Sequence, residues 1–391
     1  SGYHHGEASL NGAIVNMAQD FVGSNNINLL LPNGQFGTRL QGGKDSASER
    51  YIFTRLNKIT RQIFRKEDDD ILNYLDDDGL SVEPIFYVPI IPMVLVNGAL
   101  GIGTGFATNI PCYDPKQIIH CIKQKIQDHE DGMNYKVLLN PHYRGFKGKI
   151  LHSDEQKYLT YGCYHVKSKH SIVITELPIG LWNEVYLQFL EKCIDTKKFG
   201  LRDYKDMSTD KDVHIELQFI NSVDLEDEED LYKLTQNLKC SSSLNTSNMY
   251  LFNKDEILTK YDSVNDIINE FVTTRIDYYI KRKEAQIKHM EALLQLYSNK
   301  YKFVMELLND TIDLRKKKSS EIEAMLSSKQ YDKIEQSYHY LIKMPMDNVN
   351  EENVQKLKNE YDHTCKSLET LKSTTPISIY YNELCELEKS I

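Results

Sequence analysis

PNGQFGTRLQGGKDSASERYIFT, residues 32–54, is the stretch that most constrains the local fold, because four of the ten residues from 34 to 43 are glycine. A loop with this many glycines bends sharply or lets its backbone approach another group closely. Arg50 and Tyr51 follow the loop. Apolar residues then recur at spacings of four, three and four, at Ile52, Leu56, Ile59 and Ile63. This spacing predicts a helix that begins at or near Tyr51.

The segments on either side of this stretch have mixed patterns. Before it, five apolar residues at helical spacing predict a helix that Ser9 can cap and that residues 23–26 end: Leu10, Ile14, Met17, Ala18 and Phe21. After it, residues 89–96 resemble a buried strand interrupted by prolines. Strand-like runs follow at 148–152, 171–176 and 213–219, with helical patterns near 115–128 and 183–193. The mixture is typical of an α+β fold.

Residues 262–310 keep apolar side chains at three-to-four spacing, and residues 262–344 contain neither proline nor glycine. They predict a long, exposed helix of coiled-coil character, ~70 Å long at about 1.5 Å per residue. Because a lone long helix needs a partner, we expect residues 319–340 and 346–372 to run back beside it. The residues expected to face inward are Val354, Leu357, Tyr361, Leu368 and Leu371.

Charge is unevenly distributed along the chain. The net charge is −10, which argues against a general nucleic-acid-binding surface. Up to Lys66, however, eight Lys and Arg outnumber four Asp and Glu, a local charge of +4. A basic face that binds DNA and an ordinary solvated surface explain this contrast equally well. The acidic runs at 68–70 and 76–78 are expected in a solvent-exposed loop and not at a metal.

The other bulk features exclude several classes of protein. No apolar run approaches the 18 residues of a membrane span. The seven cysteines are scattered and never as close as C-x-x-C, which fits neither a disulfide framework nor a zinc site. His4 and His5 are adjacent, and adjacent side chains point in different directions on a regular element, which disfavours a chelate.

The Arg50-Tyr51 pair has the residue types that phosphodiester chemistry needs. A tyrosine attacks phosphorus if neighbouring groups stabilise the phenolate and the charge developing on the phosphate. An arginine supplies permanent charge and two parallel donors to phosphate oxygens. A histidine brought close in space can bond the same phosphate or transfer a proton. By itself this is unspecific, because the chain holds 25 tyrosines.

Seven ordered strings make the pair specific. They are YHHGE (3–7), AQDFVGSNN (18–26), PNGQFGTR (32–39), GGKD (42–45), RYIFT (50–54), VNGALGIGTG (96–105) and ELPIG (176–180). Together they closely resemble the cleavage-and-religation region of eukaryotic-type (type IIA) DNA topoisomerase II. The resemblance is strong over roughly 1–115 and is one of pattern only in the helical C-terminal third.

The resemblance implies a role for each matching residue. Tyr51 would attack a DNA phosphate and become linked to the 5′ end, and Arg50 and His5 would hold that phosphate. Ile102 would wedge between base pairs and bend the DNA; the alternative is a core residue. The remaining candidate DNA contacts are His4, Ser24, Asn26, Arg39 and Lys44.

The resemblance also implies the wider organisation. A winged-helix DNA-cleavage domain is expected at 1–88, an α/β tower domain at 89–254, and coiled-coil helices ending in a dimerisation gate at 255–391. The enzyme would act on double-stranded DNA as a homodimer. It would need Mg²⁺ and ATP, bound by a TOPRIM-type portion and an ATPase portion that the chain does not contain, so the chain would not cleave DNA unaided. It would work in the nucleus if cellular, or in host cytoplasm or nucleus if viral.

Two other classes of function compete with this reading. A non-enzymatic, DNA-bridging coiled-coil protein would also explain residues 262–310. A metal-dependent nuclease using His4 and His5 would cut DNA without a protein-linked end.

Overall fold

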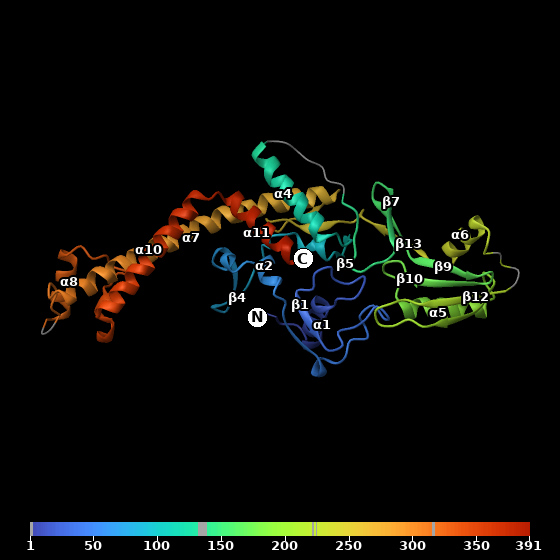
Figure 1. Cartoon of the computed structure of the whole chain (residues 1–391), viewed down its shortest axis with the longest axis horizontal. Coiled ribbons are helices and arrows are strands. Elements are labelled where there is room, and N and C mark those ends of the chain that lie inside the picture. Colours follow the sequence, from blue (N-terminus) through green and yellow to red (C-terminus); the bar gives the residue numbers. More distant parts are fainter. Residues whose placement is uncertain (1–2, 132–138, 221–222, 224, 315–316) are drawn as a thin grey trace. The chain divides into compact units, whose positions relative to one another are not determined.

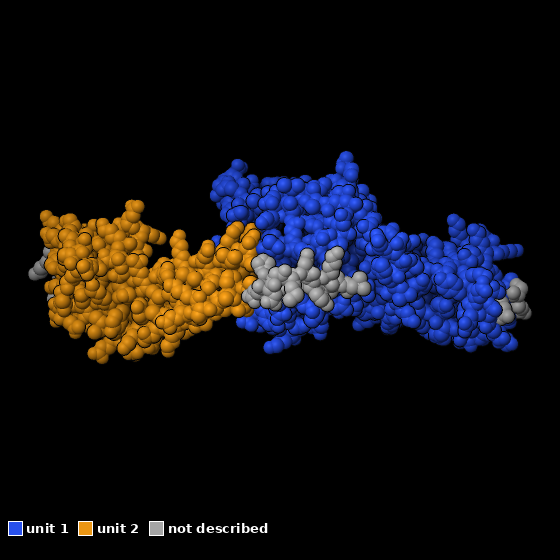
Figure 2. All heavy atoms as spheres, turned by 90° about the horizontal axis from the view of Figure 1, so that it is seen from above, with its two compact units in different colours: residues 1–275, 381–391 blue, residues 276–380 orange. Residues whose placement is uncertain are grey.

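The computed structural model describes residues 3–131, 139–220, 223, 225–314 and 317–391. These residues form two compact units. The first comprises residues 1–275 with 381–391, and the second comprises residues 276–380, coloured blue and orange in Figure 2. Helix α7 (Val264–Leu308) begins in the first unit and continues in the second. Helices and antiparallel strands are mixed along the chain, which confirms the predicted α+β class.

The first part of unit 1 consists of short elements around the glycine-rich loop. In order they are α1 (Glu7–Ala18), β1 (Leu30–Asn33), β2 (Phe53–Leu56), α2 (Thr60–Ile63), β3 (Tyr74–Asp77), β4 (Leu80–Pro84), α3 (Met93–Val96), β5 (Ala99–Ile102), β6 (Ala107–Ile110) and α4 (Pro115–Asp131). Strands β1 and β2 pair antiparallel, with Asn33 opposite Phe53. Ala18, Phe36 and Ile52 form a small buried core beneath them.

The helix predicted from Tyr51 is wrong. Residues Glu49–Tyr51 form a single 3₁₀ turn, β2 follows, and only Thr60–Ile63 are α-helical. Pairing with β1 satisfies the backbone groups of β2, so they need no helical bonds. The apolar spacing was misleading because the four residues share no buried face: Ile52 is buried, whereas Leu56 is half exposed.

The strand predicted at residues 89–96 is also wrong, although its burial is correct. Ile90, Ile91, Leu95 and Val96 are fully buried. They belong to a loop and to the single turn of α3, which Pro92 precedes as N-cap. A proline has no N–H for a strand ladder but is tolerated where a helix begins.

The rest of unit 1 is built on antiparallel sheets. Its elements are β7 (Lys149–Asp154), β8 (Lys157–Tyr161), β9 (Cys163–Ser168), β10 (Ser171–Glu176), α5 (Asn183–Asp195), β11 (Leu201–Asp206), β12 (Ile215–Phe219), α6 (Glu228–Asn237), β13 (Ser241–Asn245), β14 (Tyr250–Phe252) and β15 (Leu258–Lys260). The strand orders are β11-β12-β10-β9 and β13-β8-β7. Helix α5 packs on the four-stranded sheet (Figure 1), where Tyr186 and Leu190 meet Ile172, Ile215 and Leu217. The predicted strands and helices of this region are confirmed.

Unit 2 contains the long helix α7 and the segments that return beside it. These are α8 (Ser319–Ser328), α9 (His339–Ile342), α10 (Glu351–Ser373) and the first residues of α11 (Pro376–Ser390). Helix α10 lies alongside α7 (Figure 1), and Lys283 Nζ on α7 donates to the carbonyls of Lys372 at 3.1 Å and Thr374 at 2.7 Å. The long helix and its returning partner are confirmed.

One inward-facing residue of this pair was predicted incorrectly. Leu357 and Leu368 of α10 are buried, but Tyr361 between them is exposed. The buried positions are eleven residues apart, three helical turns, so they define a narrow stripe that Tyr361 falls outside.

Candidate functional site

Tyr51 ends the 3₁₀ turn that joins the glycine-rich loop to β2. Its amide N–H donates to the carbonyl of Ser48 at 2.9 Å. The next residue, Ile52, enters the core, while the Tyr51 side chain is 73% exposed. The guanidinium carbon of Arg50 lies 6.0 Å from the centroid of the Tyr51 ring. The turn therefore presents a phenol and a guanidinium together to solvent.

Hydrogen bonds hold the glycine-rich loop in one shape. The side-chain amide of Gln19, at the end of α1, donates to the carbonyls of Phe36 at 2.9 Å and Gly43 at 3.2 Å. The Gly43 amide in turn donates to the Thr38 carbonyl at 2.9 Å. Gly37 has a φ of +99°, and a Cβ there would overlap the backbone of Gly43. The loop before Tyr51 is therefore preorganised, which a group that must meet a substrate atom requires.

Trp182, the residue before α5, packs directly against this loop. Gly42 has a φ of +64°, and a Cβ at this position would overlap the Trp182 indole. The ring of Phe21 meets the same indole edge-on, at 5.7 Å between centroids. No motif in the sequence singled out Trp182, although it is the only tryptophan of the chain.

Arg39, a candidate phosphate contact, lies inside the molecule. Its guanidinium forms an ion pair with Glu176 at the end of β10, and both side chains are almost completely buried. Glu176 also accepts from the amides of Leu177 at 3.0 Å and Lys147 at 3.3 Å. The pair thus ties the loop to the sheet. Glu176 was missed as a site residue; the signal was a lone carboxylate ending an apolar strand.

The other three candidate phosphate contacts differ in exposure. Asn26 is buried, and its amide donates to the carbonyls of Tyr113 and His142, both at 2.9 Å. Ser24 is half-buried, and its hydroxyl donates to the carbonyl of Phe21 at 2.5 Å. Lys44 is exposed. Of the four, Lys44 has a side chain in the solvent, next to the fixed loop.

His4 and His5 are exposed at the start of the described chain. His4 Nε2 lies 3.4 Å from Asp77 Oδ2 of β3. The His5 ring meets Tyr3 edge-on, at 5.5 Å between centroids. Among the described residues no hydrogen bond or ion pair joins either histidine to Tyr51. Their role at the phosphate therefore stays a prediction.

Ile102 stands at the tip of a β-hairpin, formed by β5 and β6, with Ile102 opposite Ala107. Its side chain is 92% exposed, so the alternative that it is a core residue is wrong. The hairpin is held from its β6 side, where the Asn109 amide donates to the Asn248 carbonyl at 2.7 Å and Thr108 bonds the Tyr250 carbonyl. A fixed hairpin thus carries an apolar side chain into solvent.

The first acidic run is not simply a solvent-exposed loop. Asp68 is buried, and its carboxylate pairs with the fully buried guanidinium of Arg275 at 2.7 Å. The prediction of a surface position is therefore wrong for Asp68. The partner lies 207 residues away, so the acidic run itself carried no sign of it.

Two other kinds of site are absent from the described residues. They contain no cluster of three or more His, Cys, Asp or Glu side chains placed to hold a metal ion. None of their helices combines the length and apolar character that crossing a membrane requires.

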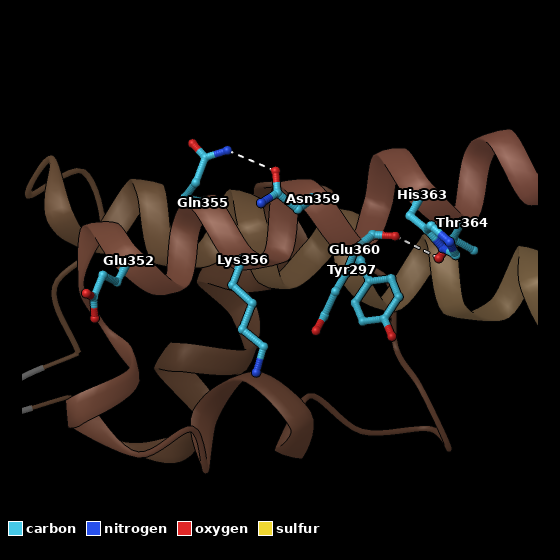
Figure 3. A pocket seen from close by; sticks show the side chains of 8 residues that line it. All are labelled: Tyr297, Glu352, Gln355, Lys356, Asn359, Glu360, His363 and Thr364. Carbon is cyan, nitrogen blue, oxygen red and sulfur yellow. Dashed lines mark hydrogen bonds between the residues drawn. The ribbon is translucent and has the colours of Figure 1, made fainter.

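A shallow polar hollow lies in unit 2, between α10 and Tyr297 of α7 (Figure 3). The hydrogen bonds drawn there, Gln355 to Asn359 and Thr364 to the Glu360 carbonyl, each join residues four apart on α10. These are bonds within one helix, so this is a solvated helix face and not an assembled site.

Comparison with known proteins covers the whole chain. The family model for the A-type chain of DNA gyrase/topoisomerase IV matches residues 1–386. DNA topoisomerase 2 of Arabidopsis thaliana is 38% identical over 439 residues, covering 100% of this chain and 29% of the relative. DNA topoisomerase 2 of Invertebrate iridescent virus 6 is 35% identical, covering 100% of this chain and 33% of the relative. The chain thus spans about a third or less of these relatives.

A solved structure matches just as completely. The crystal structure of the Plasmodium falciparum topoisomerase II DNA-binding, cleavage and re-ligation domain superposes with a TM-score of 0.89. The sequences are 35% identical, and the match covers 100% of this chain and 56% of that one.

Proposed function

The chain belongs to the DNA gyrase/topoisomerase IV family, and we propose that it cuts and rejoins DNA as the breakage-reunion region of a type IIA topoisomerase, with Tyr51 as the nucleophile. One observation carries the choice of Tyr51: a fixed turn holds its phenol in solvent, 73% exposed, with a guanidinium beside it. Several other tyrosines are partly or fully buried, and burial raises the pKa of Tyr340 to about 12.

The reaction is an exchange of esters. The phenol oxygen of Tyr51 attacks a DNA phosphorus, and the bond from phosphorus to the 3′ oxygen breaks. The phenol gives up its proton to a base, and the leaving 3′ oxygen takes one up, so protons balance. Since one phosphodiester replaces another, the step is nearly isoenergetic and the 3′ hydroxyl can reverse it. Arg50 stabilises the negative charge on the phosphate with two parallel donors.

The remaining site residues divide by position. Ile102, on its fixed hairpin, enters a base step and bends the duplex. Lys44 contacts backbone phosphate from the loop, and His5 and His4 approach the cleaved phosphate from the N-terminal side. Ser24, Asn26 and Arg39 remain candidate DNA contacts, but the burial of Asn26 and Arg39 favours a role in holding the loop.

The complete enzyme of this proposal acts on double-stranded DNA as a homodimer. Residues 1–88 form a winged-helix cleavage domain, residues 89–254 a tower domain, and residues 255–391 a coiled coil with a dimerisation gate. Support for the last division is the 45-residue helix α7 with α10 returning beside it.

Two cofactors complete the enzyme. Mg²⁺ supplies charge stabilisation at the cleaved phosphate, and ATP drives passage of the second duplex. In this proposal a TOPRIM-type portion holds Mg²⁺ and a separate domain holds ATP. Relatives include a mitochondrial enzyme of Dictyostelium discoideum and a viral one, so the location follows the source; for a cellular enzyme we propose the nucleus.

The test is the covalent protein–DNA adduct. In the full-length enzyme with Mg²⁺, Tyr51→Phe should abolish the adduct on denaturing gels with 5′-blocked, 3′-labelled DNA, while DNA affinity changes less than about twofold, since one exposed hydroxyl is lost. Tyr232→Phe, at a 54% exposed tyrosine of α6, is the matched control and should keep the adduct.

Each competing outcome identifies another function. Adduct formation by Tyr51→Phe at the normal level contradicts the choice of nucleophile. Binding without cleavage by the unmodified enzyme supports a DNA-bridging protein. Cleavage without a protein-linked end, lost when His4 and His5 become alanine, supports a metal-dependent nuclease.

A further inference from the structure

Strand β5 carries the two most exposed large apolar side chains of the described chain. Ile102 is 92% exposed and Leu100 is 84% exposed. They are two residues apart on one strand, so their side chains leave the same face. Single exposed apolar residues are common on protein surfaces and need no explanation. Two neighbours at this exposure on one face form a continuous apolar ridge.

The hairpin holds this ridge in place without covering it. Leu100 pairs with Asn109 and Ile102 pairs with Ala107, so β6 places a polar and a small side chain opposite them. Strand β6 is anchored on its other side by the bridge from Thr108 to Met249, which leaves β5 as the outer strand. Cross-strand packing therefore does not account for the Leu100 side chain.

The surroundings of the ridge are uncharged. No Asp, Glu, Lys or Arg occurs in residues 84–113, on either side of the hairpin. A neutral apolar ridge does not attract phosphates, but it suits the floor of a groove, where apolar side chains enter base steps and displace water. The distance along the strand between the two side chains is about 6.6–6.8 Å, close to two base-pair rises of about 3.4 Å.

From this geometry we infer that Leu100 is a second DNA-contacting residue, which lies in the minor groove about two base pairs from the step that Ile102 opens and disfavours a G·C pair there. The inference rests on the proposed DNA-cleavage function. In the minor groove a G·C pair differs from A·T by the guanine N2 amino group. A leucine pressed against that donor removes its water and offers no acceptor, which is unfavourable. Leu100 thus contributes sequence preference to DNA bending.

The test measures bending of end-labelled duplexes by fluorescence energy transfer, with the full-length enzyme. One G·C pair is moved stepwise through an A·T background, and each duplex is repeated with inosine in place of guanine, which lacks only the N2 amino group. At one or two positions beside the bend, G·C should weaken bending about fivefold relative to A·T, and I·C should restore it, since a leucine's contact is at stake.

Variants assign the effect to the residue. Leu100→Ala should reduce the G·C penalty below about twofold and weaken bending of A·T duplexes about fivefold, because a large apolar contact is lost. Leu100→Met, of similar volume, should retain both. Leu80→Ala is the matched control: Leu80 is 71% exposed on the β3–β4 hairpin, beside the acidic residues 76–78, and should change neither quantity.

The results separate this inference from the proposed function. If Ile102→Ala abolishes bending but Leu100→Ala behaves like Leu80→Ala, the inference about Leu100 is overturned and the proposed function stands. If the unmodified enzyme neither bends DNA nor forms the Tyr51 adduct, both are overturned. A G·C penalty that inosine does not relieve also contradicts the minor-groove contact.

Discussion

Removing the charge of Glu176 tests whether Arg39 holds the loop or binds DNA. Glu176→Gln keeps the shape of the side chain and an oxygen that accepts from the amides of Leu177 and Lys147. It removes the counter-ion of Arg39, whose side chain is only 6% exposed, from a position that is itself completely buried. The variant therefore leaves a guanidinium in the interior without its negative partner.

The magnitude follows from this burial. Breaking a buried ion pair by removing one partner costs about 3–5 kcal/mol. Natural domains are stable by roughly 5–15 kcal/mol, so a large share of the stability is lost. For a unit of this size each kcal/mol lowers the melting temperature by roughly 2 °C, which gives a decrease of roughly 6–10 °C. Adding Arg39→Met removes the buried cation and should recover at least half of the loss.

Two assays on the same variants separate structure from DNA contact. A thermal melt reports the stability, and DNA affinity at several salt concentrations reports the number of phosphate contacts. Each lost phosphate contact reduces the salt slope by about 0.9. Lys44→Ala, at an exposed residue of the same loop, should reduce the slope by about this amount without changing the melt. The reasoning is refuted if Arg39→Met reduces the slope and leaves the melting temperature unchanged.

Two further predictions concern the loop and the thiols. Gly42→Ala, whose Cβ would overlap the Trp182 indole, should slow adduct formation by roughly 10²-fold through misplacement of the loop; Gly79→Ala, also at positive φ but with open space around it, should not, and equal rates in the two variants would contradict this. Burial raises the pKa of Cys112 to about 12, so at pH 8 only about one molecule in 10⁴ carries its reactive thiolate, and iodoacetamide should label the half-buried Cys385 long before Cys112 in a mass-spectrometric time course; comparable rates would show that the interior opens.

Local patterns predicted the regular elements that depend on local contacts. The long helix α7, the returning helix α10 and the strands around 150, 174 and 217 all follow from the spacing of apolar residues. Their side-chain period reflects which face is buried, and a period can be counted in a sequence. The same counting failed at Ile52 and Leu56, because pairing with β1 decided that backbone.

Partners distant in the sequence could not be predicted in this way. Arg39 meets Glu176 across 137 residues, and Asp68 meets Arg275 across 207. A buried charge with its partner and an exposed charge look the same in a sequence, because burial depends on what the rest of the chain places over them. This is why Arg39 was predicted as a DNA contact, and Asp68 as a surface residue.

The sequence alone determined the family, since ordered motifs from YHHGE to ELPIG survive without any knowledge of contacts, and it singled out Arg50-Tyr51 among many tyrosines. Only the tertiary structure decided how that pair is presented. The Gln19 and Trp182 contacts fix the loop, Ile52 fills the core, and Tyr51 is thereby left in solvent. The physical reason is that identity is a property of residues in order, whereas exposure is a property of everything packed around them.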